Sequence, residues 1–283
     1  MIDCYVVMGN PVAHSQSPFI HAAFARQTGQ AMEYGRLLCP LGSFVATLHA
    51  FGADGGRGCN VTVPFKFDAF HAAGHHTERA RNAGACNALR RDGDGWLGDN
   101  TDGAGLLRDI ERNAGVTLAG RRVLLIGAGG AAAGVLGPLL AARPAQLVIA
   151  NRTRSKALDL LDTHAAARRA RVVGSTDLRA TGLEECGMGF DVVINASASS
   201  MLGAGVPVPS SVLRPGSLAV DMMYGPAAQG FIDWAAAHHA TARDGLGMLV
   251  EQAAEAFELF RGVQPETGPV LTALRHRMTE ATR

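Results

Sequence analysis

The sequence predicts an α/β protein of two domains, the first of which has a mostly parallel sheet. Three observations indicate this class. The chain has 283 residues, which exceeds the size that one hydrophobic core usually serves. Short apolar runs alternate with helical patterns on both sides of residues 121–151. Residues 121–151 combine a hydrophobic strand, a glycine turn, an alanine-rich helix and a second strand, which is typical of a nucleotide-binding domain.

The part of the chain before the glycine turn alternates strands with helices. The expected strands are 5–8, 33–38 and 60–63, and the expected helices are 19–28, 43–51 and 66–73. This alternation favours parallel strands with helices on the faces of the sheet. Residues 88–97 predict a hairpin that turns at residues 92–95 and closes this first sheet.

The same alternation resumes after the glycine turn. Helices over 155–167 and 231–239 and strands over 171–173, 192–195 and 218–222 complete the second sheet. Residues 246–261 predict a further helix, because Leu249, Ala253 and Phe257 recur at helical spacing. Gln252 lies on the apolar face of that helix, so its amide must find hydrogen-bond partners in a core network or in a polar ligand.

The glycine turn predicts a pyrophosphate site. Gly127, Gly129 and Ala132 follow a strand and open a helix, so backbone N–H groups can approach a phosphate there. Residues 123–142 also form an uncharged stretch long enough to span a bilayer. A strand, turn and helix explain these residues better, because the stretch contains five glycines and Pro138.

The strand that follows ends in a basic loop that favours NADP(H) over NAD(H). An NAD-selective fold usually places an acidic residue here for the ribose 2′-hydroxyl, and an acid would repel a 2′-phosphate. This chain instead has polar and basic residues, namely Asn151, Arg152, Thr153, Arg154 and Lys156.

Composition excludes several other classes of protein. The net charge of +1 provides no overall field for nucleic acid or an anionic membrane, so neither partner is expected. The N-terminus has no basic region before its short apolar run, and we expect a cytoplasmic protein. The five cysteines are odd in number and widely spaced, so we interpret them as small buried hydrophobic residues. No metal site is predicted, because the histidines show no ligand spacing.

Three polar motifs in the first hundred residues predict a ligand site. Ser15 and Ser17 precede Pro18 at a helix start, which suits a carboxylate or plain helix capping. Asn60 and Thr62 alternate with apolar residues, so they share a face at the end of a strand, where α/β sheets form a ligand-binding crevice. Lys66 begins the next helix, and its side chain either enters this crevice or is solvated at the surface.

The third motif, GDNTDG at residues 98–103, is an acidic turn before a helix. Its structural explanation is helix capping. The combination with Lys66 and a hydride-cofactor site favours chemistry, because reduction of a ketone needs a proton as well as a hydride. A Lys66/Asp102 pair would relay that proton.

Nine short motifs follow one another along the chain, namely GNPVAHSQSP, NVTVPFK, GACNAL, GDNTDG, IGAGGAA, NRT, INAS, DMMY and DGLGMLVEQAA. In the order and spacing of these motifs, the chain resembles bacterial shikimate dehydrogenases of the NADP-dependent biosynthetic type over nearly its whole length. The resemblance implies a substrate domain over 1–102, completed by C-terminal helices of 245–283, and a Rossmann-type NADP-binding domain over 103–244. It also implies reversible reduction of 3-dehydroshikimate to shikimate in aromatic amino-acid biosynthesis.

The resemblance further implies roles for individual residues. Lys66 and Asp102 would be the catalytic pair. Substrate would be bound by Ser15, Ser17 and Tyr224 at its carboxylate and by Asn60, Thr62, Asn87 and Gln252 at its ring hydroxyls. NADP(H) would be bound by Gly127, Ala128, Gly129, Gly130, Ala131, Asn151, Arg152, Thr153, Arg154 and Lys156, with Met222, Gly245 and Met248 flanking the nicotinamide. Core packing explains both methionines equally well.

Departures from the family pattern and two alternatives remain. Relatives often have Val or Ala at the position of Cys86 and Thr at the position of Ala88. The basic residues around Arg154 and Lys156 also vary within the family. One alternative is a relative that acts on quinate or an aminoshikimate, and the other is a non-catalytic NADP-binding sensor. We expect a monomer or homodimer.

Overall fold

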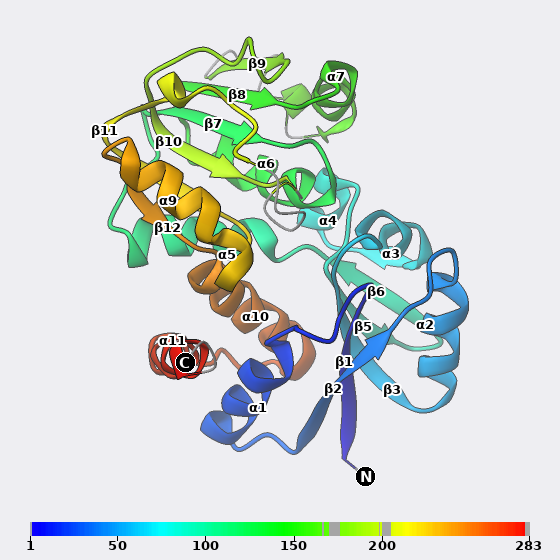
Figure 1. Cartoon of the computed structure of the whole chain (residues 1–283). Helices are drawn as coiled ribbons and strands as arrows, with labels where there is room; N and C mark the ends of the chain where they lie inside the picture. Colours follow the sequence, from blue (N-terminus) through cyan, green and yellow to red (C-terminus); the bar gives the residue numbers. More distant parts are fainter. Residues whose placement is uncertain (1, 166, 170–175, 198, 200–204, 281–283) are drawn as a thin grey trace. The chain divides into compact units, whose positions relative to one another are not determined.

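The computed structural model describes residues 2–165, 167–169, 176–197, 199 and 205–280 (Figure 1). The chain forms two compact units. The first unit comprises Met1–Gly105 and Leu249–Arg283, and the second unit comprises Leu106–Met248.

The first unit is built on a six-stranded sheet with the order β2-β1-β3-β5-β6-β4. β1 pairs in parallel with β2 and β3, β4 pairs in parallel with β6, and the β3–β5 and β5–β6 pairings are antiparallel. The predicted hairpin is confirmed, with Asp92 opposite Gly95 at its turn. The strands are β1 (Asp3–Gly9), β2 (Met32–Leu38), β3 (Gly56–Val61), β4 (His75–His76), β5 (Ala88–Asp92) and β6 (Gly95–Asp99).

Helices cover this sheet on both faces (Figure 1). They are α1 (Ser17–Thr28), α2 (Phe44–Ala53), α3 (Lys66–Ala72), α4 (Glu78–Ala83), α10 (Leu246–Arg261) and α11 (Gly268–Glu280). α4 and β4 were not predicted, because α4 is short and lacks an apolar repeat and β4 has two residues. β3 ends at Val61, so Thr62 lies just beyond the strand and not within it as predicted.

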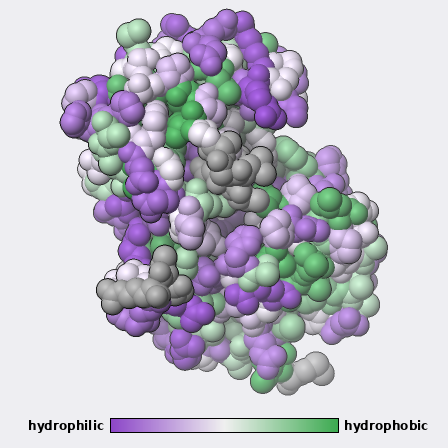
Figure 2. Space-filling model, viewed as in Figure 1, coloured by the Kyte–Doolittle hydropathy of each residue, from purple (hydrophilic) through white to green (hydrophobic). Residues whose placement is uncertain are grey.

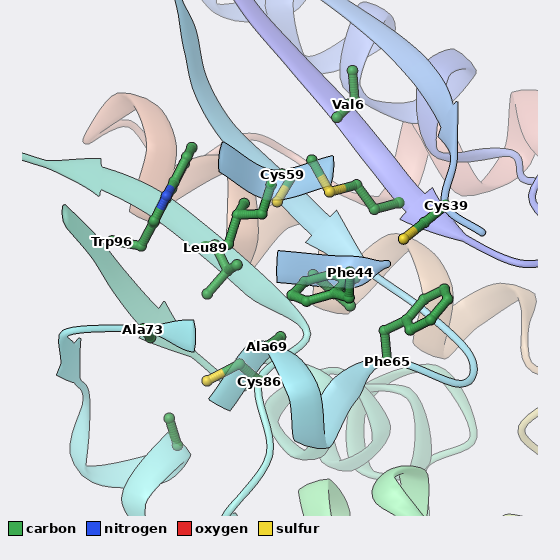
Figure 3. Close-up of a cluster of buried hydrophobic side chains, with 14 residues drawn as sticks. Val6, Cys39, Phe44, Cys59, Phe65, Ala69, Ala73, Cys86, Leu89 and Trp96 are labelled. Atoms are coloured by element: carbon green, nitrogen blue, oxygen red, sulfur yellow. The ribbon is translucent and has the colours of Figure 1, made fainter. Parts of the chain in front are cut away.

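Alternation along the strands separates two apolar clusters. On one face, Val6, Cys59, Phe65 and Cys86 belong to a larger cluster with residues of α2 and α3 (Figure 3). On the other face, Tyr5 and Ala88 pack with Ala256 and Phe260 of α10. Asn60 follows Cys59 in β3 and therefore faces the α10 side.

The cysteines behave largely as expected. Cys39, Cys59, Cys86 and Cys186 are buried and free, whereas Cys4 is exposed, so the prediction of burial is wrong for Cys4. Cys4 lies near the start of β1, before the buried part of that strand begins. Burial raises the pKa of Cys86 to about 12, which keeps its thiol protonated and apolar.

The second unit has a wholly parallel six-stranded sheet with the order β12-β11-β10-β7-β8-β9. Its strands are β7 (Arg122–Ile126), β8 (Gln146–Ala150), β9 (Asp177–Thr181), β10 (Phe190–Asn195), β11 (Leu213–Asp221) and β12 (Thr241–Arg243). The predicted strand over 171–173 lies outside the described residues. Instead β9 provides the strand beside β8, with Gln146 opposite Asp177.

Helices connect these strands. They are α5 (Asp102–Arg108), which begins in the first unit, η1 (Asp109–Asn113), α6 (Gly130–Ala141), α7 (Arg154–Thr163), η3 (Ser210–Val212), η4 (Gly225–Ala228) and α9 (Gln229–Ala237). The uncharged stretch 123–142 forms β7 and α6, as predicted. Among the described residues, no helix combines the length and the apolar character that crossing a bilayer requires.

The surface is mixed in character. Figure 2 shows hydrophilic residues interspersed with smaller hydrophobic groups on the visible face of the molecule. Exposed apolar side chains include Leu38, Leu41, Val45 and Phe67, all in the first unit.

Candidate active site

Lys66 and Asp102 form an ion pair in the first unit. Lys66 is the first residue of α3 and Asp102 is the first residue of α5. The Nζ–Oδ2 distance is 2.5 Å, and the two side chains are 13% and 6% exposed. The short turn after β3 and the turn after β6 thus bring an amine and a carboxylate from residues far apart in sequence into direct contact.

Asn87 connects this pair to α10. Its Nδ2 lies 2.8 Å from Asp102 Oδ1 and 3.0 Å from Gln252 Oε1, and its Oδ1 accepts from the backbone N–H of Thr101. Gln252 also donates through Nε2 to the Leu249 carbonyl. The prediction that the inward-facing amide of Gln252 finds polar partners is confirmed, and those partners belong to a core network.

A buried ion network holds the acidic turn that carries Asp102. Arg79 Nη2 lies 2.6 Å from Asp99 Oδ2, and Arg79 Nη1 lies 2.6 Å from Glu255 Oε2 on α10. Thr77 also donates to Asp99, whose side chain is 1% exposed. Burial alone would raise the pKa of Asp99, but the Arg79 guanidinium lowers it below its usual value, so the carboxylate stays charged.

The two predicted serines lie together at the start of α1. Ser15 Oγ donates to Ser17 Oγ over 3.2 Å, and both residues are buried. Arg36 of β2 donates from Nε and Nη2 to the Ser15 carbonyl, at 3.0 and 2.6 Å. Pro lies in the first turn of α1, and the N-cap residue Gln16 makes no side-chain capping bond. The backbone N–H of Ser17 donates to Ser15 Oγ over 3.3 Å, so Ser15 satisfies one N–H at the helix start while both hydroxyls remain candidates for ligand binding.

Asn60 links the serine region to the Lys66/Asp102 pair. Its Nδ2 donates to the Asn87 carbonyl over 3.3 Å, and its Oδ1 accepts from the Tyr34 hydroxyl over 2.6 Å. Thr62 is half-buried next to Gly9, where an added Cβ would collide with the Thr62 methyl group. The first unit therefore presents hydroxyls, amides, one amine and one carboxylate in a connected set.

This arrangement can bind a small polyhydroxylated acid and move a proton. Serine hydroxyls next to a helix N-terminus suit a carboxylate, and amides suit ring hydroxyls. An ammonium group held by a nearly buried carboxylate can protonate a developing alkoxide and then be reprotonated. The chemistry that this set supports is general acid–base catalysis on an alcohol or ketone.

The glycine turn of the second unit has the geometry of a dinucleotide site. Gly127 has φ of 112°, and a Cβ there would lie 3.0 Å from the Ala196 backbone, so no larger residue fits without strain. Gly129 is the N-cap of α6 and has open space where a Cβ would stand. A phosphate could therefore approach the first N–H groups of α6, at Gly130 and Ala131, while Ala128 is half-buried in the turn.

The basic loop follows β8 at the neighbouring strand end. Arg152, Thr153, Arg154 and Lys156 are exposed, and Asn151 Nδ2 donates to the Thr153 carbonyl over 2.8 Å. Arg154 lies 3.4 Å from Glu185, and this ion pair is exposed on both sides. Positive charge therefore gathers where the sequence predicts a 2′-phosphate, although Arg154 already has an acidic neighbour.

The remaining predicted residues belong to the second unit. Met248 is buried and Met222 is half-buried. A Cβ at Gly245 would collide with the Met222 carbonyl, so only glycine lets the two backbone segments at Gly245 and Met222 lie this close together. Tyr224 is the N-cap residue of η4 and is half-buried. Its role at the substrate carboxylate stays a prediction.

Sequence reasoning missed several side chains that support the site. Thr101 is fully buried, and its hydroxyl lies 3.2 Å from both Asn87 Oδ1 and Gln252 Oε1. Its place in GDNTDG next to Asp102 was a usable signal. Tyr34, Arg36 and Arg79 gave no such signal, because their partners lie far away in sequence.

Three family models match the chain. The model of the shikimate dehydrogenase substrate binding domain matches residues 7–89, that of shikimate / quinate 5-dehydrogenase matches residues 109–203, and that of the shikimate 5'-dehydrogenase C-terminal domain matches residues 245–275. The first and last of these matches fall mainly in the first unit.

Individual relatives cover nearly the whole chain. The shikimate dehydrogenase (NADP(+)) of Acidovorax sp. strain JS42 is 60% identical over 273 residues, which are 96% of each protein. The crystal structure of an Ael1 enzyme from Pseudomonas putida is 44% identical, with a TM-score of 0.84 and coverage of 96% of this chain and 98% of that one. Shikimate 5-dehydrogenase from Thermus thermophilus, in complex with NADP(H) and shikimate, is 30% identical, with a TM-score of 0.82 and coverage of 98% and 99%.

The similarity in sequence thus extends over both units, the two-domain α/β fold is that of the solved relatives, and the chain belongs to the shikimate dehydrogenase family.

Proposed function

We propose that this protein catalyses the reversible NADPH-dependent reduction of 3-dehydroshikimate to shikimate. The observation that carries the proposal is the Lys66–Asp102 ion pair, nearly buried and joined through Asn87 to Gln252. It stands in a chain that is 60% identical to a shikimate dehydrogenase (NADP(+)). The first unit would be the substrate domain and the second unit the cofactor domain.

The residues of the first unit divide the work of binding and proton transfer. Ser15 and Ser17 bind the substrate carboxylate, and Asn60, Thr62, Asn87 and Gln252 bind the ring hydroxyls. Lys66 donates a proton to the oxygen of the ketone while the carbonyl carbon is reduced. Asp102 stabilises the charged amine and, since its second oxygen contacts Asn87, stays fixed in orientation during the transfer.

The second unit fits NADP(H). Gly127 and Gly129 leave the turn open to a pyrophosphate, and the N–H groups at the start of α6 would bind it, together with the turn residues from Gly127 to Ala131. Arg152 and the neighbouring Asn151, Thr153, Arg154 and Lys156 would bind the 2′-phosphate, and Met222, Gly245 and Met248 would flank the nicotinamide. When bound, the cofactor supplies the hydride.

Initial rates with purified protein test this function. We expect NADP⁺ with shikimate to be the preferred pair when NADP⁺ and NAD⁺ are each tested against shikimate and quinate. A preference for NAD⁺ would contradict the cofactor assignment, and a preference for quinate would favour the quinate alternative. Binding of NADPH without turnover of dehydroshikimate would support a non-catalytic sensor.

Two broader properties complete the proposal. The protein would be a monomer or a homodimer, and it would be located in the cytoplasm. Sedimentation of the purified protein at several concentrations would determine the first, and fractionation of the source cells would determine the second.

A further inference from the structure

Tyr34 of β2 has a position that the proposed reaction does not yet use. Its hydroxyl donates to Asn60 Oδ1 over 2.6 Å, and its ring stacks on His21 of α1 with centroids 4.1 Å apart and planes 5° apart. The ring also packs against the apolar cluster that Tyr5 of β1 forms with Ala256 and Phe260 of α10. Tyr34 is therefore held by α1 and α10 while its hydroxyl contacts a predicted substrate-binding amide.

The hydroxyl of Tyr34 is a permanent donor at neutral pH. Burial raises the pKa of Tyr34 well above its usual value, and hydrogen bonds that involve Asn60 and the Ser17 side chain offset this rise only in part. The phenol consequently keeps its proton.

Two neighbours together fix which way the Asn60 amide points. The Asn87 carbonyl lies 3.3 Å from Asn60 Nδ2 and can only accept a hydrogen bond, so the amide nitrogen must face it. The amide oxygen then faces the Tyr34 hydroxyl, which donates to it. A flipped amide would place two carbonyl oxygens against each other.

This orientation has a consequence for ligand recognition. The Asn60 oxygen accepts from Tyr34 and one N–H donates to the Asn87 carbonyl. The second N–H makes no hydrogen bond within the described part of the chain and can donate to a ligand. Asn60 is 5% exposed, so an unpartnered polar atom there would be costly. A ligand atom bound by Asn60 must therefore accept a hydrogen bond, as a hydroxyl or carbonyl oxygen does and an ammonium group does not.

We propose that Tyr34 is a positioning and specificity-determining residue, which fixes the Asn60 amide as a hydrogen-bond donor toward an oxygen of the substrate ring. The proposal rests on the proposed function of the first unit. Arg36, two residues further along the same face of β2, supports the neighbouring turn by binding the Ser15 carbonyl. One face of β2 thus supports both the carboxylate and the hydroxyl regions of the site.

The test compares Tyr34→Phe with wild-type protein. This change removes the hydroxyl and keeps the ring that stacks on His21. We expect KM for shikimate to rise roughly 3- to 10-fold while kcat changes less than about twofold, because a uniform binding interaction is weakened. In an Asn60→Ala background the same change should have no further effect on KM, since Tyr34 acts through Asn60.

Tyr5→Phe is the matched control. Tyr5 is buried in the same unit, and its hydroxyl contacts Arg261 and the Phe260 carbonyl but no predicted site residue. We expect this variant to leave KM for shikimate unchanged even where it lowers the urea midpoint. Asn60→Asp provides a second variant, which keeps an acceptor for Tyr34 but lacks the N–H, and it should raise KM at least as much as Tyr34→Phe.

The outcomes separate the two proposals. Wild-type protein that does not oxidise shikimate would overturn the proposed function itself. Active wild-type protein with an unchanged KM in Tyr34→Phe would overturn the role of Tyr34 alone, as would an equal rise in KM with and without Asn60. An Asn60→Asp variant with normal KM would show that Asn60 does not act as a donor.

Discussion

The site in the first unit and the glycine turn in the second unit are built in opposite ways. In the first unit, Lys66, Asp102, Asn87 and Gln252 are tied to one another by side-chain hydrogen bonds and are largely buried. In the second unit, the phosphate site consists of backbone N–H groups and exposed cations. A single substitution should therefore have large effects in the first site and smaller effects in the second.

Lys66→Ala tests the connected site most directly. We expect kcat to fall roughly 10²- to 10⁴-fold while KM for shikimate changes much less, because the amine acts on the proton in the transition state. Steady-state rates with saturating NADP⁺ measure the change. Lys156→Ala, in the exposed loop, should keep kcat near the wild-type value. Near-normal turnover in Lys66→Ala would remove the lysine from the mechanism.

The Arg79–Asp99 ion pair, which holds the turn that carries Asp102, should contribute strongly to the stability of the first unit. Arg79→Met leaves the Asp99 carboxylate buried without a cation, which typically lowers the free energy of unfolding by about 3 to 5 kcal/mol. Urea titration measures the loss. The control is Arg57→Met, which breaks the more exposed Arg57–Asp3 pair of the same unit and should cost about 1 kcal/mol or less. Equal losses in both variants would contradict the importance of burial.

The exposed loop should show a smaller effect that is specific to the cofactor. We expect Arg152→Ala to raise KM for NADP⁺ about 10-fold or more and to leave KM for NAD⁺ unchanged, since only NADP⁺ has the 2′-phosphate. Arg168→Ala, at an exposed position of the same unit outside the loop, serves as the control. A matching rise for both cofactors would rule out a 2′-phosphate contact.

Acid should weaken the first unit through His21. The imidazole is fully buried, its ring nitrogens have no hydrogen-bond partner among the described residues, and burial lowers its pKa from 6.5 to about 3 despite the nearby Asn60 side chain. Above pH 6.5 the imidazole is mostly neutral in both states, so His21 adds little pH dependence to stability. Between pH 6.5 and about 3 the unfolded chain takes up a proton that the folded chain does not, so stability falls as pH falls.

The measurement is the free energy of unfolding at pH 6.5 and pH 5. His21→Phe should lose about 2 kcal/mol less than wild-type protein over this interval, at about 1.4 kcal/mol for each pH unit. Parallel curves for His21→Phe and wild-type protein would show that His21 stays uncharged in both states or is charged in both.

Local patterns were sufficient for most of the fold. The alternation of strands and helices predicted β1, β2, α1, α2 and α3, and the apolar repeat predicted α10 with its observed bounds. β9 and α4 escaped prediction, because strand pairing and capping by Thr77 stabilise them more than any apolar repeat does. The end of β3 also differed, since its last pairings with β1 and β5 decide where the strand stops.

Some residues of the candidate site could likewise be singled out from the sequence, whereas others could not. Residue patterns singled out Ser15, Asn60, Lys66 and Asp102 as candidates, because turns and strand ends of α/β sheets bring polar side chains to one edge. Gln252 was a candidate as an amide on the apolar face of a helix, and the roles of all five residues stay predictions. Residue patterns contained no information on Tyr34 or Arg79. Each of these residues matters through a partner that is near in space and distant in the chain, namely Asn60 for Tyr34 and Glu255 for Arg79.

The sequence by itself determined the class of fold, the glycine turn and the chemical groups of the site, because these depend on periodicity and residue type. The tertiary structure decided which of those groups touch, which amide faces which partner and which charges are shielded from water. The physical reason is that hydrogen-bond direction and burial are properties of packed neighbours, and the spacing of residues along the chain does not contain them.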